Sequence, residues 1–259
     1  MGYLYAVTGK GGVGKTTLSA ILVRQLIKNG LEPVLAIDAD PNACLDSALG
    51  VIAASTVGQA REEVREEAEA AQKSGISKHE MLQMKIAESL VEADSFDLIA
   101  MGRPEGAGCY CYANNVLKSI ITEMSDAYPY VVLDNEAGLE NLSRRIVTKV
   151  DTLMLVSDPS AAGLKTLARL HELANEMGVE YGRLIIVINR IRGSLPSGIE
   201  EIKKITKADE IIGLPDDSEL AAYAENSKNI MELPDNNPVV EILNQYLIRN
   251  SEFGIRNSE

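Results

Sequence analysis

The chain has 259 residues, a mass of 28.0 kDa and a formal net charge of -13 from 25 basic and 38 acidic residues. A domain of this size buries a core without disulfides, so we expect one domain over residues 1–250 and a flexible tail over residues 251–259. The acidic balance argues against nucleic acid and membrane surfaces as partners. The first residues lack a signal-peptide pattern, which predicts a cytoplasmic protein with reduced thiols.

Short apolar runs alternate along the chain with stretches in which apolar residues recur at helical spacing. The run YLYAV at 3–7 precedes a helix from about Thr16 to Lys28, and PVLAI follows at 33–37. Further strands are predicted at 97–101, 130–134, 152–156, 183–189 and 210–214. Most of these runs are continuously apolar, which is typical of strands buried on both faces. The order predicts an α/β fold with a mostly parallel central sheet flanked by helices.

Two segments outside this alternation also carry helical patterns. The residues from Gly58 to Ala93 indicate two helices, the first so charged that a solvated helix or a mobile insertion is favoured over a functional element. The stretch NPVVEILNQYLIRN after Asn236 predicts a final packing helix.

The first strand runs into GKGGVGKT, which fits the phosphate-binding pattern G-x-x-x-x-G-K-[ST] between a strand and a helix. Its glycines let backbone N–H groups surround phosphate oxygens, Lys15 reaches the β and γ phosphates, and the Thr16 hydroxyl ligates Mg²⁺. A glycine turn with chance lysines, or a dinucleotide site, is the weaker reading. The nucleotide-binding residues predicted here are Gly9, Lys10, Gly11, Gly12, Val13, Gly14, Lys15, Thr16 and Thr17.

The run KGGVGKTT resembles the deviant Walker-A ATPases, which include the nitrogenase iron protein, septum-placing and chromosome-partitioning ATPases and several metal-insertion ATPases. The resemblance implies a three-layer P-loop NTPase fold that hydrolyses ATP to ADP and phosphate. It also implies that Lys10 reaches the nucleotide of a second protomer, which makes ATP binding and homodimer formation one event. The alternative is that Lys10 is a solvated loop lysine.

Acidic residues follow two of the predicted strands. AIDADPNACLD places Asp38 and Asp40 two apart, so both should project from one side of the strand end. The resemblance implies that Asp40 orients the attacking water and that Asp38 lies near Mg²⁺, although both could simply cap the next helix. YVVLDNEAGLE brings Asp134 to the sheet edge as a Mg²⁺ ligand through water, with a phosphate-sensing switch over 135–140.

The base of the nucleotide is expected near the last two strands. In VINR at 187–190 the resemblance implies that Asn189 reads the adenine edge, with Arg190 beside it. The turn LPDD at 214–217 offers Pro215 and Asp216 for the other side of the base, and an ordinary strand-end turn is the alternative.

Two of the three cysteines, Cys109 and Cys111, stand one residue apart in GRPEGAGCYCYANN. Two thiolates leave Zn²⁺ or Ni²⁺ half coordinated, and a second copy of the chain would complete the four. Core burial and a redox pair are the alternatives. Cys44 is expected to pack on a short helix, and His79 and His171 are expected to be structural.

The run FDLIAMGRPEGAGCYC, with KGGVGKTT and DNEAGLENL, resembles the CooC-type ATPases, which insert nickel into carbon monoxide dehydrogenase and acetyl-CoA synthase. The resemblance implies a nickel or zinc site shared by two protomers at Cys109 and Cys111, and metal release on hydrolysis. An iron-sulfur electron-transfer ATPase similar to the nitrogenase iron protein is the first alternative. A membrane- or DNA-positioning ATPase is the second, although residues 238–250 hold one Arg and no Lys.

Overall fold

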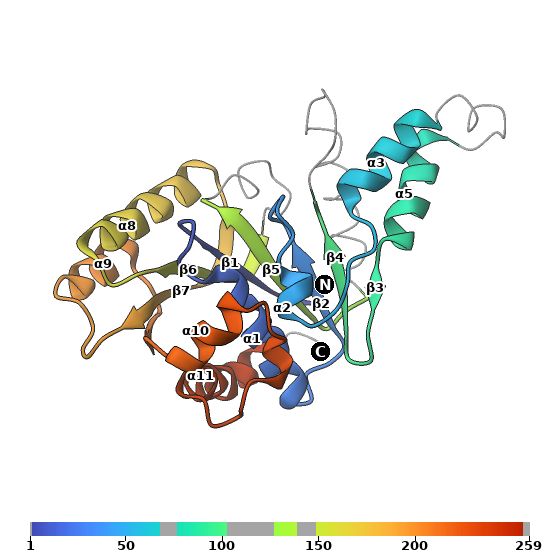
Figure 1. Cartoon of the computed structure of the whole chain (residues 1–259). Coiled ribbons are helices and arrows are strands. Elements are labelled where there is room, and N and C mark those ends of the chain that lie inside the picture. The colour runs from blue at the N-terminus through green and yellow to red at the C-terminus, as the bar shows by residue number, and fades with distance from the viewer. Residues whose placement is uncertain (1, 68–76, 103–126, 139–148, 256–259) are drawn as a thin grey trace.

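The computed structural model describes residues 2–67, 77–102, 127–138 and 149–255. Within them a single sheet runs through the molecule in the order β3-β4-β2-β5-β1-β6-β7-β8 (Figure 1). All neighbouring strands are parallel except β3 and β4. The strands are β1 Tyr3–Gly9, β2 Val34–Asp38, β3 Val91–Glu92, β4 Phe96–Ala100, β5 Tyr130–Ala137, β6 Lys149–Ser157, β7 Glu180–Ile191 and β8 Glu210–Pro215. The predicted α/β fold is confirmed, and only β3 lacked a counterpart among the predicted strands.

Helices cover both faces of the sheet and make it the middle of three layers (Figure 1). One face carries α1 Lys15–Lys28, α2 Leu45–Ala48, α10 Ser218–Glu225, the 3₁₀ turn η1 Ile230–Glu232 and α11 Pro238–Ile255. The other face carries α3 Val57–Glu66, α5 Lys78–Glu88, α8 Ala161–Glu176 and α9 Ile199–Thr206. Successive strand residues alternate between the two cores, as Ala6 and Val7 do, and this is why the central strands are apolar throughout.

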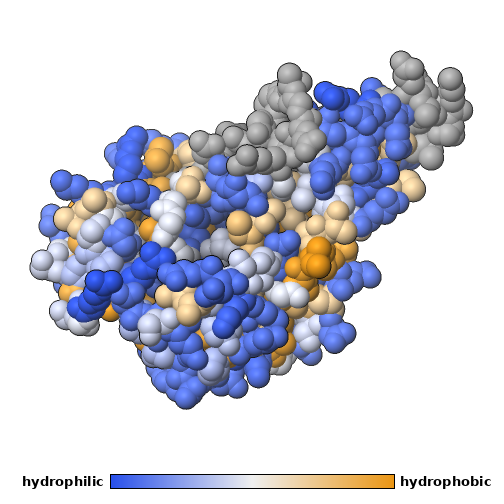
Figure 2. All heavy atoms as spheres, viewed as in Figure 1, coloured by the Kyte–Doolittle hydropathy of each residue, from blue (hydrophilic) through white to orange (hydrophobic). Residues whose placement is uncertain are grey.

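Helix α3 belongs to the second of these layers. Its apolar residues Val57, Ala60 and Val64 recur at helical spacing and are buried in the core, while three of its charged residues are exposed. Figure 2 shows hydrophilic side chains over the α3 and α5 region. The sequence suggested a solvated helix or a mobile insertion here, and that interpretation is wrong for α3 because one face of it is core.

Arg24, a residue of α1, fixes this helix to the segment before α11. This side chain is 2% exposed, and its Nη2 donates to the Leu233 carbonyl at 2.6 Å and to Asp235 at 2.5 Å. The ion pair ties α1, which follows the phosphate loop, to the segment that leads into α11. That last helix continues to Ile255, so the backbone over 251–255 is helical where the sequence predicted a tail. No helix in the described ranges is long and apolar enough to cross a bilayer.

Candidate nucleotide-binding site

The phosphate loop joins β1 to α1 at the carboxyl edge of the sheet. Gly12 has φ +77° and Gly14 has φ +94°, conformations that residues with a side chain rarely adopt. A Cβ on Gly14 would also lie 2.6 Å from Asn189 Nδ2. Both the positive φ and this close contact therefore favour glycine at this position. Helix α1 begins at the next residue and has no acidic side chain in its first turn. Its N-terminal N–H groups therefore face the loop as an anion-binding end.

Lys15 occupies this first turn with a side chain that is almost fully enclosed. The residue is 7% exposed, and its Nζ donates to the Lys10 carbonyl at a long 3.4 Å. An ammonium has three donors, and this single contact is the one hydrogen bond that the described residues give it. A phosphate oxygen beside the loop would supply the missing acceptors. Lys10 itself is exposed.

Two carboxylates meet where β2 and β5 run side by side. Asp38 and Asp134 are partners in the parallel register, and each is 1% exposed. Burial raises the pKa of Asp38 to about 6, although the N–H groups of Leu45 and Asp40 oppose it. Burial, followed by the charge of Asp38, raises the pKa of Asp134 to about 7. Both carboxyl groups therefore ionise less readily than a free aspartate, and a bound cation would favour their ionised form.

The two oxygens of Asp134 differ in their surroundings. Ser19 Oγ donates to Oδ1 at 3.1 Å, whereas Oδ2 is buried and has no hydrogen-bond partner among the described residues. Thr16, half-buried in the first turn of α1, also acts to lower the Asp134 pKa through its hydroxyl. An unsatisfied buried carboxylate oxygen beside a threonine hydroxyl is an arrangement of hard oxygen donors that fits Mg²⁺ and its water ligands.

Asp38 and Asp40, which were predicted to project from one side of the strand end, lie in different surroundings. Asp38 accepts from the Leu45 N–H at 2.8 Å and from the Asp40 N–H at 3.0 Å, so the helix-capping alternative holds for it. Asp40 is half-buried, and its Oδ1 accepts from the backbone N–H of Asn42 at 2.8 Å.

Beyond Asp134, β5 is fastened to the strand that carries the phosphate loop. Gly138 donates its N–H to the Gly9 carbonyl at 3.0 Å, and the Thr8 hydroxyl donates to the Gly138 carbonyl. Asn135 Nδ2 donates to the Val7 carbonyl at 3.1 Å. Gly138 has φ +92°, which glycine tolerates. Asn135 and Gly138 of the expected switch are therefore joined to β1, and residues 139–140 lie outside the described ranges.

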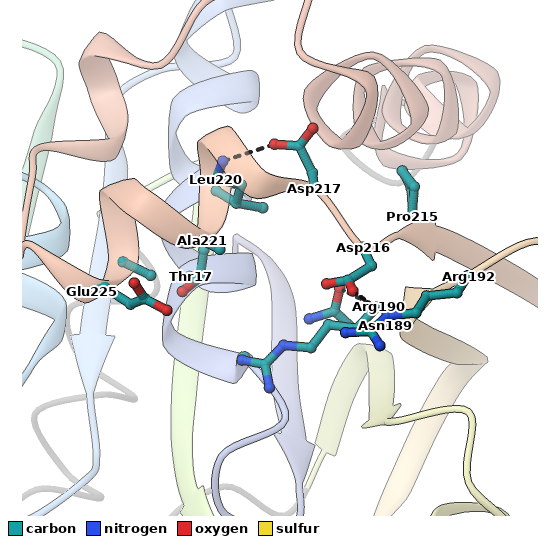
Figure 3. A pocket seen from close by; sticks show the side chains of 12 residues that line it. Thr17, Asn189, Arg190, Arg192, Pro215, Asp216, Asp217, Leu220, Ala221 and Glu225 are labelled. Carbon is teal, nitrogen blue, oxygen red and sulfur yellow. Dashed lines mark hydrogen bonds and ion pairs between the residues drawn. The ribbon is translucent and has the colours of Figure 1, made fainter.

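A cavity of about 300 Å³ opens beside the loop, between the ends of β7 and β8 and helix α10 (Figure 3). Asn189 stands between loop and cavity: its Nδ2 donates to the Val13 carbonyl at 2.9 Å, and its Oδ1 accepts from the Arg190 N–H at 2.9 Å. The lining includes six residues that the sequence predicted, namely Gly14, Thr17, Asn189, Arg190, Pro215 and Asp216.

Helix α10 supplies the rest of the wall, which the motifs had not predicted. Asp217 starts this helix by accepting the Leu220 N–H at 2.7 Å (Figure 3). Arg192 crosses the rim, and its Nε donates to Asp216 Oδ2 at 2.6 Å. The additional lining residues are Arg192, Asp217, Leu220, Ala221, Ala224 and Glu225. The run DSEL after the LPD turn is an N-cap signal that could have revealed α10.

The cysteine predictions have mixed outcomes. Cys44 was expected to pack, and this is wrong: it is exposed, because it is the N-cap residue outside the buried face of α2. Partial desolvation of the sulfur, followed by the charges of Asp38 and Asp40, nevertheless raises the pKa of its thiol, which disfavours the thiolate. Cys109 and Cys111 lie outside the described residues. Among the described ones, no cluster of three or more His, Cys, Asp or Glu could hold a metal.

Residues 4–230 match the family model of the CobQ/CobB/MinD/ParA nucleotide binding domain. The chain belongs to this nucleotide-binding family. The matched range contains the loop, both carboxylates and the cavity, so the site described above lies within the family's nucleotide-binding domain.

Individual relatives within the family carry different names. An uncharacterized ATP-binding protein of Methanocaldococcus jannaschii is 40% identical over 91% of this chain and 93% of its own. The carbon monoxide dehydrogenase accessory protein CooC of Rhodospirillum rubrum is 32% identical over 84% and 85%. Among solved structures, the septum site-determining protein MinD of Pyrococcus horikoshii with Mg-ADP superposes with a TM-score of 0.68 at 18% identity, covering 99% and 100% of the two chains.

Proposed function

We propose that this protein is an ATPase that forms a homodimer with ATP and inserts nickel into carbon monoxide dehydrogenase or acetyl-CoA synthase. The observation that carries the ATPase part is the set of enclosed, incompletely partnered groups at the carboxyl edge of the sheet. Among the described residues Asp134 Oδ2 has no hydrogen-bond partner and the Lys15 ammonium has one long contact, and Mg²⁺ and a triphosphate would supply the rest.

In this proposal the nucleotide lies along the loop with its base in the α10 cavity. The backbone of the loop and Lys15 bind the β and γ phosphates, and Thr16 with Asp134 holds Mg²⁺, which would neutralise phosphate charge when bound. Asp40 orients the attacking water, because its carboxylate is half-buried two residues after the end of β2. Asn189, Arg190, Pro215 and Asp216 surround the base.

The dimer part rests on Lys10. Its side chain is exposed while its carbonyl is held by Lys15, so the backbone is fixed and the ammonium remains available to a second protomer. Each nucleotide would then be bound by Lys15 of one chain and Lys10 of the other. ATP favours the dimer only to the extent that it binds this state more tightly than the monomer.

The metal part rests on Cys109 and Cys111 and on the likeness to CooC. The described chain just before them offers a connection to the nucleotide. Met101 donates its N–H to the Asp38 carbonyl at 2.8 Å, and Gly58 donates its N–H to the Met101 carbonyl at 2.9 Å. The segment that leads to the cysteines therefore leaves the sheet beside the carboxylate pair. A shift of Asp38 on hydrolysis would be transmitted to this segment through the backbone hydrogen bond to Met101. Ni²⁺ is the cargo in this scheme, with Zn²⁺ a competitor for the same thiolates.

Anaerobic gel filtration with elemental analysis tests the proposal. With ATP and Ni²⁺ the chain should elute as a dimer that holds about one metal per two chains, in keeping with four thiolates for a tetrahedral or square-planar ion. The double variant Cys109→Ser, Cys111→Ser should still dimerise with ATP but lose the metal. Nickel retained by that variant, or a monomer in all conditions, would contradict the proposal.

The same measurement separates the alternatives. Iron together with sulfide would favour an iron-sulfur ATPase similar to the nitrogenase iron protein. ATP-dependent sedimentation with anionic vesicles or DNA, without bound metal, would favour a positioning ATPase, which the likeness to MinD structures supports.

A further inference from the structure

Ser19 lies four residues after the phosphate-loop lysine, inside the first turns of α1, and no motif identifies it. It is fully buried, with no exposed surface. Serine is a weaker helix former than alanine, and a mid-helix serine usually bonds to the carbonyl four residues earlier in its own helix. Here the hydroxyl leaves the helix and donates to Asp134 Oδ1 on β5 at 3.1 Å. Helix formation therefore gives no reason for a serine at this place.

Asp134 depends on this contact because it has few other donors. The carboxylate lies within β5 and is 1% exposed, and Asp38 on the neighbouring strand repels it. Ser19 occupies Oδ1, and Oδ2 has no partner among the described residues. One oxygen is thus anchored and the other is left available, which is the arrangement that a ligand to a metal-bound water requires.

Thr16 cannot replace Ser19 in this task. The two residues are three positions apart and lie on the same face of α1, both next to Asp134. Thr16 is half-buried in the first turn, and under the proposed function its hydroxyl binds Mg²⁺. Ser19 is one turn deeper and fully enclosed, so it remains bonded to Asp134 when Thr16 turns to the metal.

We infer that Ser19 is a positioning residue for Mg²⁺: it holds the Asp134 carboxylate so that Oδ2 is presented to the metal site. The inference rests on the proposed nucleotide site and adds a residue to it. Ser19 does not touch nucleotide or metal, so its removal should weaken Mg²⁺ without weakening the nucleotide in the absence of Mg²⁺.

Calorimetric titration of the full chain with ADP, once with excess Mg²⁺ and once with EDTA, tests this. The dissociation constant in EDTA divided by the constant with Mg²⁺ gives the factor by which Mg²⁺ tightens ADP binding. In Ser19→Ala this ratio should fall by about tenfold or more, since partners that orient metal ligands contribute about 10- to 100-fold to metal affinity. The constant in EDTA should stay at the wild-type value. Ser19→Thr keeps the hydroxyl and should keep the wild-type ratio.

Ser89→Ala is the matched control. Ser89 is also buried, at 3% exposure, and its Oγ donates to the Ile86 carbonyl at 2.7 Å on the opposite face of the sheet. Its loss should lower the urea midpoint of unfolding and leave the Mg²⁺ ratio unchanged. If Ser19→Ala does not fold, Ser19→Cys retains a weak donor of similar shape and should give an intermediate ratio.

The outcomes distinguish this inference from the proposal beneath it. A wild-type ratio in Ser19→Ala, with only the unfolding midpoint lowered, would show a structural role and overturn the inference while the nucleotide site stands. Wild-type protein that binds no ADP in either condition would overturn the nucleotide site and the inference together.

Discussion

The proposed nucleotide site has two ends that differ in burial and charge. The phosphate end is the loop with the two buried carboxyl groups, and the base end is the cavity beside α10. At the phosphate end Asp38, Asp134 and Lys15 are enclosed, and their charges are only partly satisfied by the described residues. At the base end several polar groups are already paired, as in the exposed ion pair of Arg192 with Asp216 at 2.6 Å. Buried, uncompensated groups are sensitive to any change, whereas exposed pairs contribute little. The phosphate end is therefore specialised for charge, and the base end for shape.

The largest effect should come from the buried ammonium at the phosphate end. Lys15→Gln removes the charge that stabilises the phosphates, and we expect ATP hydrolysis to fall by about 100- to 1000-fold, as for the loss of one preorganised donor. Phosphate release measured in the presence of Mg²⁺ is the assay. A variant that retains near-wild-type turnover would show that the phosphates bind elsewhere.

The carboxylate pair should make the metal-free protein sensitive to pH. The pKa of Asp134 is raised from 3.8 to about 7, so between these values the unfolded chain has released a proton that the native chain retains. Stability should therefore fall as the pH rises from about 4 to about 7, by up to about 1.4 kcal/mol per pH unit for each such group. Urea unfolding in EDTA measures the slope.

Asp134→Asn is the control for this slope. The amide does not ionise, so the pH dependence should become shallower and stability at neutral pH should rise. An unchanged slope would mean that Asp134 is already ionised in the native chain.

A moderate effect should follow from loosening β5 from β1. Thr8→Val keeps the shape but loses the hydroxyl that donates to the Gly138 carbonyl, and we expect about 1 kcal/mol less stability together with altered hydrolysis. Thr206→Val on α9 removes a comparable buried bond, to the Ile202 carbonyl at 2.8 Å. That control should lose stability but keep its turnover, and identical behaviour of both variants would exclude a specific role for Thr8.

The smallest effect should come from the base end. Arg192 is 86% exposed, and Arg192→Ala breaks only its ion pair with Asp216. We expect nucleotide affinity to change by less than about fivefold, equivalent to about 1 kcal/mol. Titration at low and high salt measures it. A much larger loss would mean that Arg192 itself contacts the nucleotide and that the two ends are more alike than their burial indicates.

Most of the fold could be predicted because its signals are local. The central strands are continuous apolar runs, and each of the seven predicted runs lies within or overlaps a strand of the sheet. Strand β3 has two residues and pairs with β4 antiparallel, too short a segment for any periodicity to appear. Helix α3 was misjudged because its charges outnumber the three apolar residues that bury it.

The site was predictable to the same extent. Spacing alone suggested the loop residues, and six of the thirteen nucleotide-binding residues that the motifs suggested line the cavity. Ser19, Arg192 and α10 were missed because each matters through a partner far along the chain, as Ser19 does with Asp134. Cys44 was misplaced because the sequence did not show that it ends outside the buried face of α2.

The sequence by itself determined the alternation of strands and helices and the glycine-rich loop with the phosphate-binding pattern, since both depend on residues close together in the chain. Only the tertiary structure decided that Asp38 and Asp134 stand opposite one another with one oxygen unsatisfied. The two residues are far apart in the sequence and become neighbours because β5 lies between β2 and β1 in the sheet. The energy of a buried charge depends on the groups that surround it in space.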